Sequence, residues 1–204
     1  MNTEKLKLLT ENLSAKGYTV SYFDSASDAA DYIERSVIGK TVGMGGSVTL
    51  DELSLYERLS KSNTVYWHQK CSDKSLAAEV RGNAAGADVY FSSVNAIALT
   101  GEIVNIDGLC NRVASILYGH EKVYLVLGEN KLEDDCESAI KRARNTSAPK
   151  NARRLGRNTP CAINADRCYN CQSPERICKA LSVLYEKPMG SCIEVVLIGE
   201  SLGF

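Results

Sequence analysis

The sequence lacks both a long hydrophobic run and an excess of charge of one sign. No stretch of about 18 apolar residues occurs, so no membrane-spanning helix is predicted. The opening residues MNTEKLKLLTENL contain no apolar segment of signal-peptide length. The 24 basic and 25 acidic side chains leave a net charge of -1, which offers no electrostatic basis for binding nucleic acid or an anionic membrane. We therefore expect a cytoplasmic protein that binds neither.

Motifs for the common nucleotides and for hydrolysis are also missing. Residues 43–49 read GMGGSVT, which departs from the dinucleotide pattern G-x-G-x-x-G because Val48 stands at the last position. No Gly-Lys-Ser/Thr follows, as a phosphate-binding P-loop would require. Only two histidines, His68 and His120, are present, and neither has a visible Ser or Cys partner. A hydrolase triad is therefore not predicted.

What the sequence does contain predicts one α/β domain spanning residues 1–204. Hydrophobic residues make up 44% of the chain, which is enough for a sizeable core. Helical and strand patterns alternate through residue 92, and this alternation is typical of a parallel sheet covered by helices. Helices are expected at 3–16, 25–36 and 73–86, with a further helix near residue 49, and strands at 18–23, 40–44, 64–67 and 87–92.

The pattern changes in the second half of the chain. Residues 95–106 are β-rich and broken at Thr100-Gly101, which indicates a hairpin or an excursion strand. Two β-like runs, 181–186 and 193–198, flank the turn sequence KPMG and predict a C-terminal β-hairpin. Between these regions we expect a helix at 111–117, a central strand at 123–127, a polar helix at 133–144 and irregular chain at 145–175.

The loop formed by Gly43, Gly45, Gly46 and Ser47 is a candidate ligand-binding segment. It lies between an expected strand and an expected helix, where glycines let main-chain N–H groups approach a ligand closely. Residues 49–52 (TLDE) fit a capping box and place the start of that helix there. A carboxylate, a phosphate or the oxyanion of an acyl group would suit such a loop. The alternative is a tight turn that binds nothing.

A polar run follows in the middle of the chain. A carboxylate beside Arg112 would stay ionised, so Glu102 or Asp107 could act as a general base or orient a ligand. In an open α/β sheet these groups could meet at one strand end, where ligands bind. The alternative is a solvated hairpin with an exposed arginine. The polar residues of this run are Asn95, Thr100, Glu102, Asn105, Asp107, Asn111 and Arg112.

Eight cysteines are many for a reducing compartment, where metal binding or redox chemistry explains them better than disulfides. Four of them follow the spacing C-x6-C-x2-C-x6-C within the Cys-rich segment 158–180. These thiols predict a tetrathiolate centre, an iron–sulfur cluster of the 4Fe-4S type ahead of zinc. The alternative is a set of reduced thiols in a structural loop. The predicted ligands are Cys161, Cys168, Cys171 and Cys178; Cys71, Cys110, Cys136 and Cys192 are expected in the core.

Three longer segments, 43–59, 93–119 and 195–204, together with CYNCQSPERIC, resemble the LUD-domain family of lactate-utilisation proteins. The resemblance implies a three-layer α/β/α fold related to sugar-phosphate isomerases and CoA transferases. It also implies kinship with the small subunit of an L-lactate oxidising system, whose partner proteins carry Fe–S clusters. The cysteine cluster is similar to that of a stand-alone subgroup. Carried over by motif, Gly45, Gly46 and Ser47 form the ligand loop, and Asn95, Thr100, Glu102, Asp107, Asn111 and Arg112 line the same pocket.

These observations leave three functions open. The first is a redox component that binds a small hydroxy- or keto-acid and holds an Fe–S cluster. The second is a non-redox isomerase or transferase with Glu102 or Asp107 as general base and a structural zinc. The third is an accessory module that binds a carboxylate or phosphate ligand or docks on an Fe–S partner. All three require Ser47 and Asp107 to face one cavity.

Overall fold

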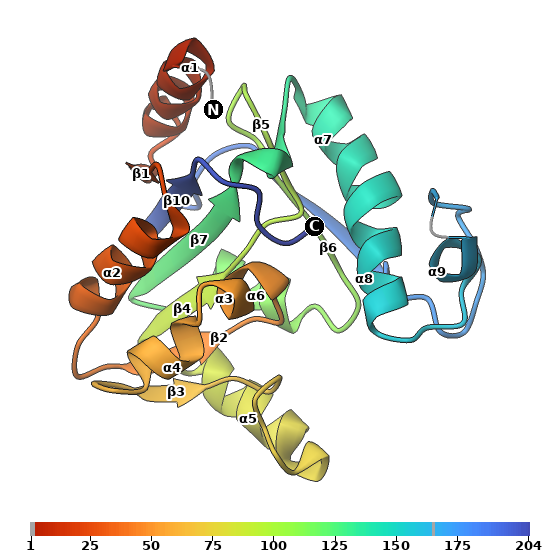
Figure 1. Cartoon of the computed structure of the whole chain (residues 1–204), viewed down its shortest axis with the longest axis horizontal. Helices are drawn as coiled ribbons and strands as arrows, with labels where there is room; N and C mark the ends of the chain where they lie inside the picture. The colour runs from red at the N-terminus through yellow and green to blue at the C-terminus, as the bar shows by residue number, and fades with distance from the viewer. Residues whose placement is uncertain (1–2, 165) are drawn as a thin grey trace.

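A six-stranded parallel sheet lies at the centre of the protein, which the computed structural model describes over residues 3–164 and 166–204 (Figure 1). Every neighbouring pair of strands in this sheet runs parallel. The α/β class expected from the alternating pattern is therefore confirmed. From one edge to the other, the strands are β1 (Thr19–Phe23), β10 (Ile193–Ile198), β7 (Lys122–Gly128), β4 (Val89–Ser92), β2 (Thr41–Met44) and β3 (Thr64–Tyr66).

Two apolar clusters cover the two faces of this sheet. Side chains alternate along each strand, so Phe91 and Val126 pack on one face and Tyr90 and Leu125 on the other. The first face is covered by α2 (Ala26–Ser36), α3 (Val48–Glu52) and α4 (Leu55–Leu59). The second is covered by α1 (Thr3–Ala15), α5 (Ala77–Ala85), which follows the short helix η1 (Lys74–Leu76), and α6 (Asn111–Leu117). The helices and the sheet form the expected three-layer arrangement.

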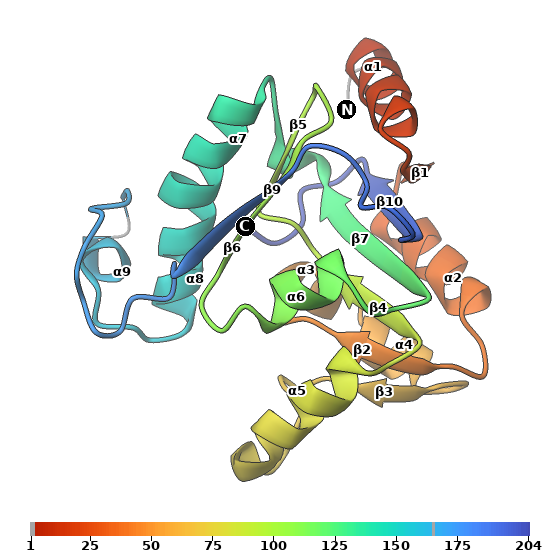
Figure 2. The ribbon, with the colours of Figure 1, turned by 180° about the vertical axis from the view of Figure 1, so that it is seen from behind.

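A second, four-stranded sheet stands beside the main one. Its strand order is β8 (Leu132–Glu133), β5 (Ala96–Ala98), β6 (Ile103–Asp107) and β9 (Ala180–Leu184). Figure 2 shows α7 and α8 running along its outer side, where small alanines of β5 and α7 pack together. Helix α7 (Cys136–Arg142) continues through a π turn (Ala143–Ser147) into α8 (Ala148–Arg154), and α9 is Pro160–Asn164.

The predicted C-terminal hairpin is wrong, although both of its strands form. Strand β9 pairs antiparallel with β6 in the second sheet, whereas β10 lies parallel between β1 and β7 in the main sheet. All six residues of β10 are buried. A strand that is apolar on both faces gains most from a central position in a parallel sheet, which explains why β10 leaves its sequence neighbour.

Two further local expectations are corrected. Residues 148–154, expected as irregular chain, form α8, because Pro149 falls in the first helical turn, where no N–H donor is needed. The helix near residue 49 begins two residues earlier than expected. Its N-cap is Ser47 and not Thr49, and Ser47 Oγ accepts a hydrogen bond from the Leu50 amide.

In the described part of the chain, the search for a helix long and apolar enough to cross a membrane finds none.

Candidate functional site

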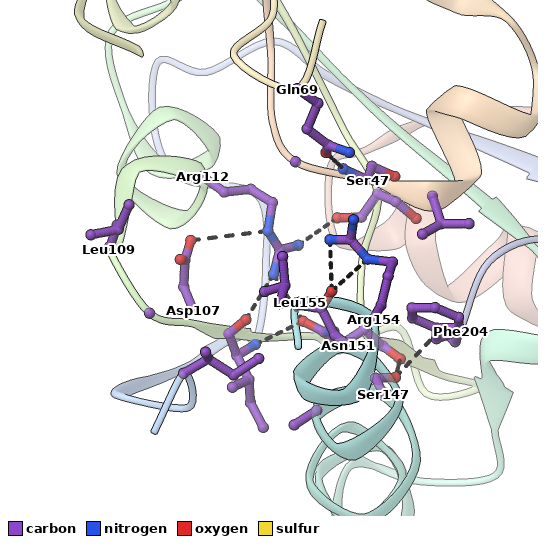
Figure 3. Close-up of a pocket in the computed structure, with 18 of the residues that line it drawn as sticks. Ser47, Gln69, Asp107, Leu109, Arg112, Ser147, Asn151, Arg154, Leu155 and Phe204 are labelled. Atoms are coloured by element: carbon purple, nitrogen blue, oxygen red, sulfur yellow. Dashed lines mark hydrogen bonds and ion pairs between the residues drawn. The ribbon is translucent and has the colours of Figure 1, made fainter. Parts of the chain in front are cut away.

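A pocket of about 550 Å³ opens where the chain leaves the carboxyl ends of five parallel strands. It lies between the loop after β2, the start of α6 and one side of α8. Figure 3 shows Ser47, Asp107, Arg112 and Arg154 converging on this space. The structure thus brings Ser47 and Asp107 to one cavity, the arrangement that every predicted function requires. The pocket is lined from these elements by Gly46, Ser47, Thr49, His68, Gln69, Lys74, Ser93, Asn95, Asp107, Asn111, Arg112, Lys131, Asn151, Arg154, Arg157 and Phe204, among others.

The glycine loop supplies one wall of the pocket through Gly46 and Ser47. Its main chain is already held by the segment after β3. The Ser47 amide donates to Gln69 Oε1 at 2.6 Å, and Trp67 Nε1 donates to the Gly45 carbonyl at 3.0 Å. The Ser47 amide is therefore not free for a ligand in this state, and α3 is only five residues long. The loop therefore contributes to the shape of the pocket and adds little positive potential to it.

Gly43 and Gly45 do not line the pocket but are required behind it. A Cβ atom on Gly43, in β2, would lie 2.2 Å from the Ala84 carbonyl oxygen of α5. A Cβ atom on Gly45 would lie 3.0 Å from Arg112 Cγ. These two positions lack side chains because a helix and an arginine pack directly against the strand end. Both were predicted as ligand-binding residues, and the structure gives them a packing role.

We expect Gly43→Ala to destabilise the protein by about 1–3 kcal/mol, because the new methyl group meets main-chain atoms that cannot move aside. Gly82 in α5 is the matched control, since a Cβ atom there meets nothing within 4 Å. Gly82→Ala should raise stability by about 0.5–1 kcal/mol through the better helix propensity of alanine. Urea unfolding of the two variants measures both values. Equal effects of the two changes would contradict the close packing of α5 on β2.

Arg112 is a structural clamp inside the pocket wall. Its Nη1 donates to the Ser93 carbonyl and Asn105 Oδ1, both at 2.7 Å. Its Nη2 donates to Asn95 Oδ1 at 2.9 Å and to the Ile106 carbonyl at 2.8 Å. These four hydrogen bonds use the donors of both terminal nitrogens. The guanidinium therefore links the connection between β4 and β5 to β6 and does not offer these donors to a ligand.

Asp107 is likewise engaged by the protein. Its Oδ1 accepts from the Cys110 amide and its Oδ2 from the Val113 amide, each at 3.1 Å. Arg112 Nε lies 3.9 Å from the same carboxylate. Asp107 therefore fixes the start of α6 and with it Asn111, which lines the pocket. Asn95 is also held, because its Oδ1 accepts from the Ile106 amide as well as from Arg112.

The structure does not bring Thr100 and Glu102 to the pocket. They stand at the turn of the β5–β6 hairpin, while Asp107 ends β6 at the opposite end. Thr100 Oγ1 donates to Glu102, and Lys16 of α1 pairs with Glu102 at 3.1 Å. Five residues of extended chain at about 3.3 Å each separate the two ends of the strand. Glu102 is therefore too far from the cavity to act there, and its predicted role as general base is not supported by its position.

Lys131, which sequence reasoning missed, is the most unusual group in the pocket. Only 3% of the residue is exposed. Its Nζ donates to Thr49 Oγ1 and to Ser93 Oγ, both at 2.8 Å. Burial, together with the positive charges of Arg142 and Arg112, lowers the pKa of Lys131 to about 7. One signal was available in the sequence: Lys131 closely follows a central strand, at the sheet edge where ligands bind.

Positive charge dominates the remaining lining. Asp107 is the one acidic side chain among the described lining residues, against five basic ones, of which Lys131 is only partly protonated at pH 7. Burial and the nearby cations Arg81, Lys74 and Arg154 also lower the pKa of His68, which keeps this imidazole neutral at pH 7. The field inside the pocket therefore favours an anion. The basic residues are Lys74, Arg112, Lys131, Arg154 and Arg157.

The four cysteines of the Cys-rich segment do not line this pocket, although Ile177 of the same segment does. Cys168 and Cys178 line a second pocket of about 230 Å³ together with Arg144 and Arg176. Arg176 Nε donates to Cys178 Sγ at 3.2 Å, and this contact raises the pKa of Arg176, with smaller contributions from the charges of Cys171 and Cys168. Three of the four predicted ligands thus surround one guanidinium.

The fourth predicted ligand, Cys161, is on α9, where its Sγ lies 3.3 Å from Thr159 Oγ1. Among residues 3–164 and 166–204, no group of three or more His, Cys, Asp or Glu side chains is placed to hold a metal ion. The four thiols are thus not arranged as a tetrathiolate centre in this structure. The 4Fe-4S cluster and its zinc alternative are not tested by it and stay predictions. The scattered cysteines are not core residues: Cys192 is exposed, and Cys71, Cys110 and Cys136 are partly buried.

The fold and the pocket define an α/β protein with a cavity at the carboxyl end of a parallel sheet, the place where open α/β sheets commonly bind ligands. The LUD domain family model matches residues 6–198, and the chain belongs to this family, which is related to lactate-utilisation proteins. The crystal structure of a DUF162 family protein from Deinococcus radiodurans is similar over 96% of this chain and 97% of that one, with a TM-score of 0.56 and 13% identity. This likeness concerns the fold. A search of curated proteins finds no match.

Proposed function

We propose that the pocket at the carboxyl end of the main sheet binds a small organic acid, a hydroxy- or keto-acid. The observation that carries this proposal is the imbalance of charge in the lining, where four basic side chains and the partly protonated Lys131 face one acidic side chain. That carboxylate, Asp107, is already occupied by two main-chain amides and by Arg112. The net positive field is therefore left for a ligand to balance.

The polar groups of the pocket match the two ends of such an acid. Arg154 of α8 stands at the exposed rim, where its Nε and Nη2 both donate to Asn151 Oδ1. A carboxylate entering here would gain a charge-assisted hydrogen bond from this guanidinium. Deeper in the pocket, Lys131 and the hydroxyl groups of Thr49 and Ser93 form a cluster suited to a hydroxyl or keto oxygen.

Size and family membership point the same way. Small-molecule pockets commonly enclose about 300–1,000 Å³, and this one encloses about 550 Å³. The LUD domain family is related to lactate-utilisation proteins. A redox role for the acid, with an Fe–S partner protein as electron carrier, remains a prediction from the cysteine pattern, and no step of the proposed function depends on it.

Arg154→Gln tests the proposal at the pocket rim. Isothermal titration with lactate, pyruvate and inorganic phosphate should give a dissociation constant for the preferred acid that is about tenfold higher in the variant, equivalent to about 1.4 kcal/mol of lost binding energy. Added NaCl should weaken binding to the unmodified protein, because the ligand is held partly by exposed charge.

The matched control is Arg153→Gln, which removes the same charge from the same helix at an exposed position outside the pocket lining. This variant should bind the acid within about twofold of the unmodified protein. Two results would reject the proposal: no binding of any of the three anions, or equal losses in the two variants.

A further inference from the structure

A lysine at position 131 lowers the stability of the fold, because its amine is buried and, in the described part of the chain, has no carboxylate paired with it. Such a position indicates a functional role for the amine. Lys131 is the last residue of the short helix η2 (Glu129–Lys131), which follows β7 directly. The residue lines the pocket although only 3% of it is exposed. Its two hydrogen-bond partners are the hydroxyl groups of Thr49 and Ser93. Its amine is therefore shielded from bulk water within the wall of the pocket.

Lys122, a partly buried lysine of the main sheet, shows what a purely structural role looks like. Lys122, at the start of β7, pairs with Glu194 at 2.7 Å, and Glu194 is 1% exposed. This carboxylate keeps the Lys122 amine charged. No ion pair to a carboxylate holds Lys131 within the part of the chain that the structure describes. Its charged neighbours are the cations Arg142 and Arg112, which disfavour the ammonium form, and the carboxylate of Glu52, whose weaker effect favours it.

A desolvated lysine next to other cations is the environment that makes an amine nucleophilic at neutral pH, because its lone pair is not tied up by a proton. The hydroxyl groups of Thr49 and Ser93 hold the nitrogen in place and can pass protons. Asp107, the alternative reactive group in the pocket, has both carboxylate oxygens bound to main-chain amides of α6. Lys131 is thus an amine in the lining whose position is fixed by two hydroxyl groups and whose protonation is disfavoured by its surroundings.

Resting on the proposed binding of a small organic acid, we propose that Lys131 forms an imine with the carbonyl carbon of a bound 2-oxo acid. The Nζ lone pair forms the new C–N bond while the carbonyl π pair moves to oxygen. One amine proton passes to that oxygen through Thr49 or Ser93 and gives the carbinolamine. The second nitrogen proton then passes to the same oxygen, the C–O bond breaks, and water leaves as the C=N bond forms. No oxidant or reductant takes part. Because an imine forms only at a carbonyl carbon, the substrate class is the keto-acid and not the hydroxy-acid.

Borohydride trapping with pyruvate tests this inference. The intact protein is incubated with pyruvate at pH 7.5 and reduced with sodium borohydride, which converts an imine to a stable secondary amine. Mass spectrometry should show an increase equal to pyruvate minus water plus two hydrogens, and peptide mapping should place it on Lys131. Lactate, which has the same carboxylate but no carbonyl group, should give no adduct.

Three variants and one binding measurement separate the possible failures. Lys131→Met should lose the adduct, while Lys141→Met, at an exposed ion pair on α7, should keep it in full. Ser93→Ala should slow adduct formation without moving its site. A thermal shift with pyruvate but no borohydride-dependent adduct, or an adduct on another lysine, overturns the imine and leaves acid binding in place. No thermal shift with pyruvate, lactate or phosphate overturns the proposed function itself.

Discussion

Lys131→Met will make the protein more stable than its unmodified form at pH 6, by about 2–3 kcal/mol. The pKa of this amine falls from 10.5 to about 7 on folding, which corresponds to a cost of about 5 kcal/mol for burying the charged form at 1.36 kcal/mol per unit. Methionine has a similar length and carries no charge. The hydroxyl groups of Thr49 and Ser93 each lose a partner, which offsets about 1 kcal/mol of the gain apiece.

The size of this stabilisation depends on pH in a defined direction. Between about pH 7 and pH 10.5 the unfolded chain keeps the Lys131 proton and the folded chain has released it, so the stability of the unmodified protein rises with pH across this window. Below pH 7 both states are protonated and the full cost is present. The advantage of Lys131→Met should therefore be constant below pH 7 and shrink by about 1.4 kcal/mol per unit above it. Urea unfolding at pH 6, 7, 8 and 9 measures the difference, in which the other titrating groups cancel.

Lys122→Met is the control, with the opposite sign. Removing the Lys122 amine leaves Glu194 buried beside Ser21 and Tyr32 without its counter-charge. Breaking a buried ion pair from one side costs about 3–5 kcal/mol, and partial exposure of Lys122 places the expected loss near the lower end. If both variants lose stability at pH 6, Lys131 is an ordinary structural lysine and the amine is not destabilised by its surroundings.

The elements that could be predicted from sequence are those set by local periodicity. Short apolar runs at β2, β4 and β7, helical spacing in α1 and α2, and the alternation of helices with strands along the chain were sufficient to predict the parallel sheet and its covering helices. The C-terminal hairpin failed because strand partners are chosen over long distances. β9 and β10 are neighbours in the chain, but half-buried β9 suits the edge of the second sheet and fully buried β10 suits the centre of the first.

The same distinction between local patterns and long-range contacts applies to the candidate site. A glycine loop after one strand and a polar run after another are local signals, and they correctly place Ser47, Asp107 and Asn111 at the sheet edge that forms the pocket. What each group does there depends on contacts from distant segments. Asp107 and Arg112 form their hydrogen bonds with the protein itself, whereas the isolation of Lys131 from a direct ion pair, within the described residues, follows from how β7, α3 and the end of β4 meet. Sequence proximity carries no information about that isolation.

Arg112→Met will destabilise the protein by about 3–5 kcal/mol, the second large effect that we expect. The guanidinium donates four hydrogen bonds to acceptors on β6 and on the connection between β4 and β5, and 12% of its side chain is exposed. Methionine fills similar space but leaves these buried oxygens without a donor, at about 1–3 kcal/mol for each that water does not reach. Arg112→Lys should recover little of the loss, because one ammonium cannot span acceptors that a planar guanidinium reaches from two nitrogens.

Urea unfolding at pH 7 measures this loss, with Arg153→Met on the exposed side of α8 as the control expected within about 0.5 kcal/mol of the unmodified protein. The change also reaches the reactive amine. Arg112 is one of the two cations that lower the pKa of Lys131, so Arg112→Met should raise that pKa and shift borohydride trapping with pyruvate toward higher pH. A stable Arg112→Met variant with unchanged trapping would contradict both the clamp and its electrostatic link to Lys131. A variant that unfolds with the expected loss but traps pyruvate at an unchanged pH, under conditions where it remains folded, would retain the clamp and remove the link.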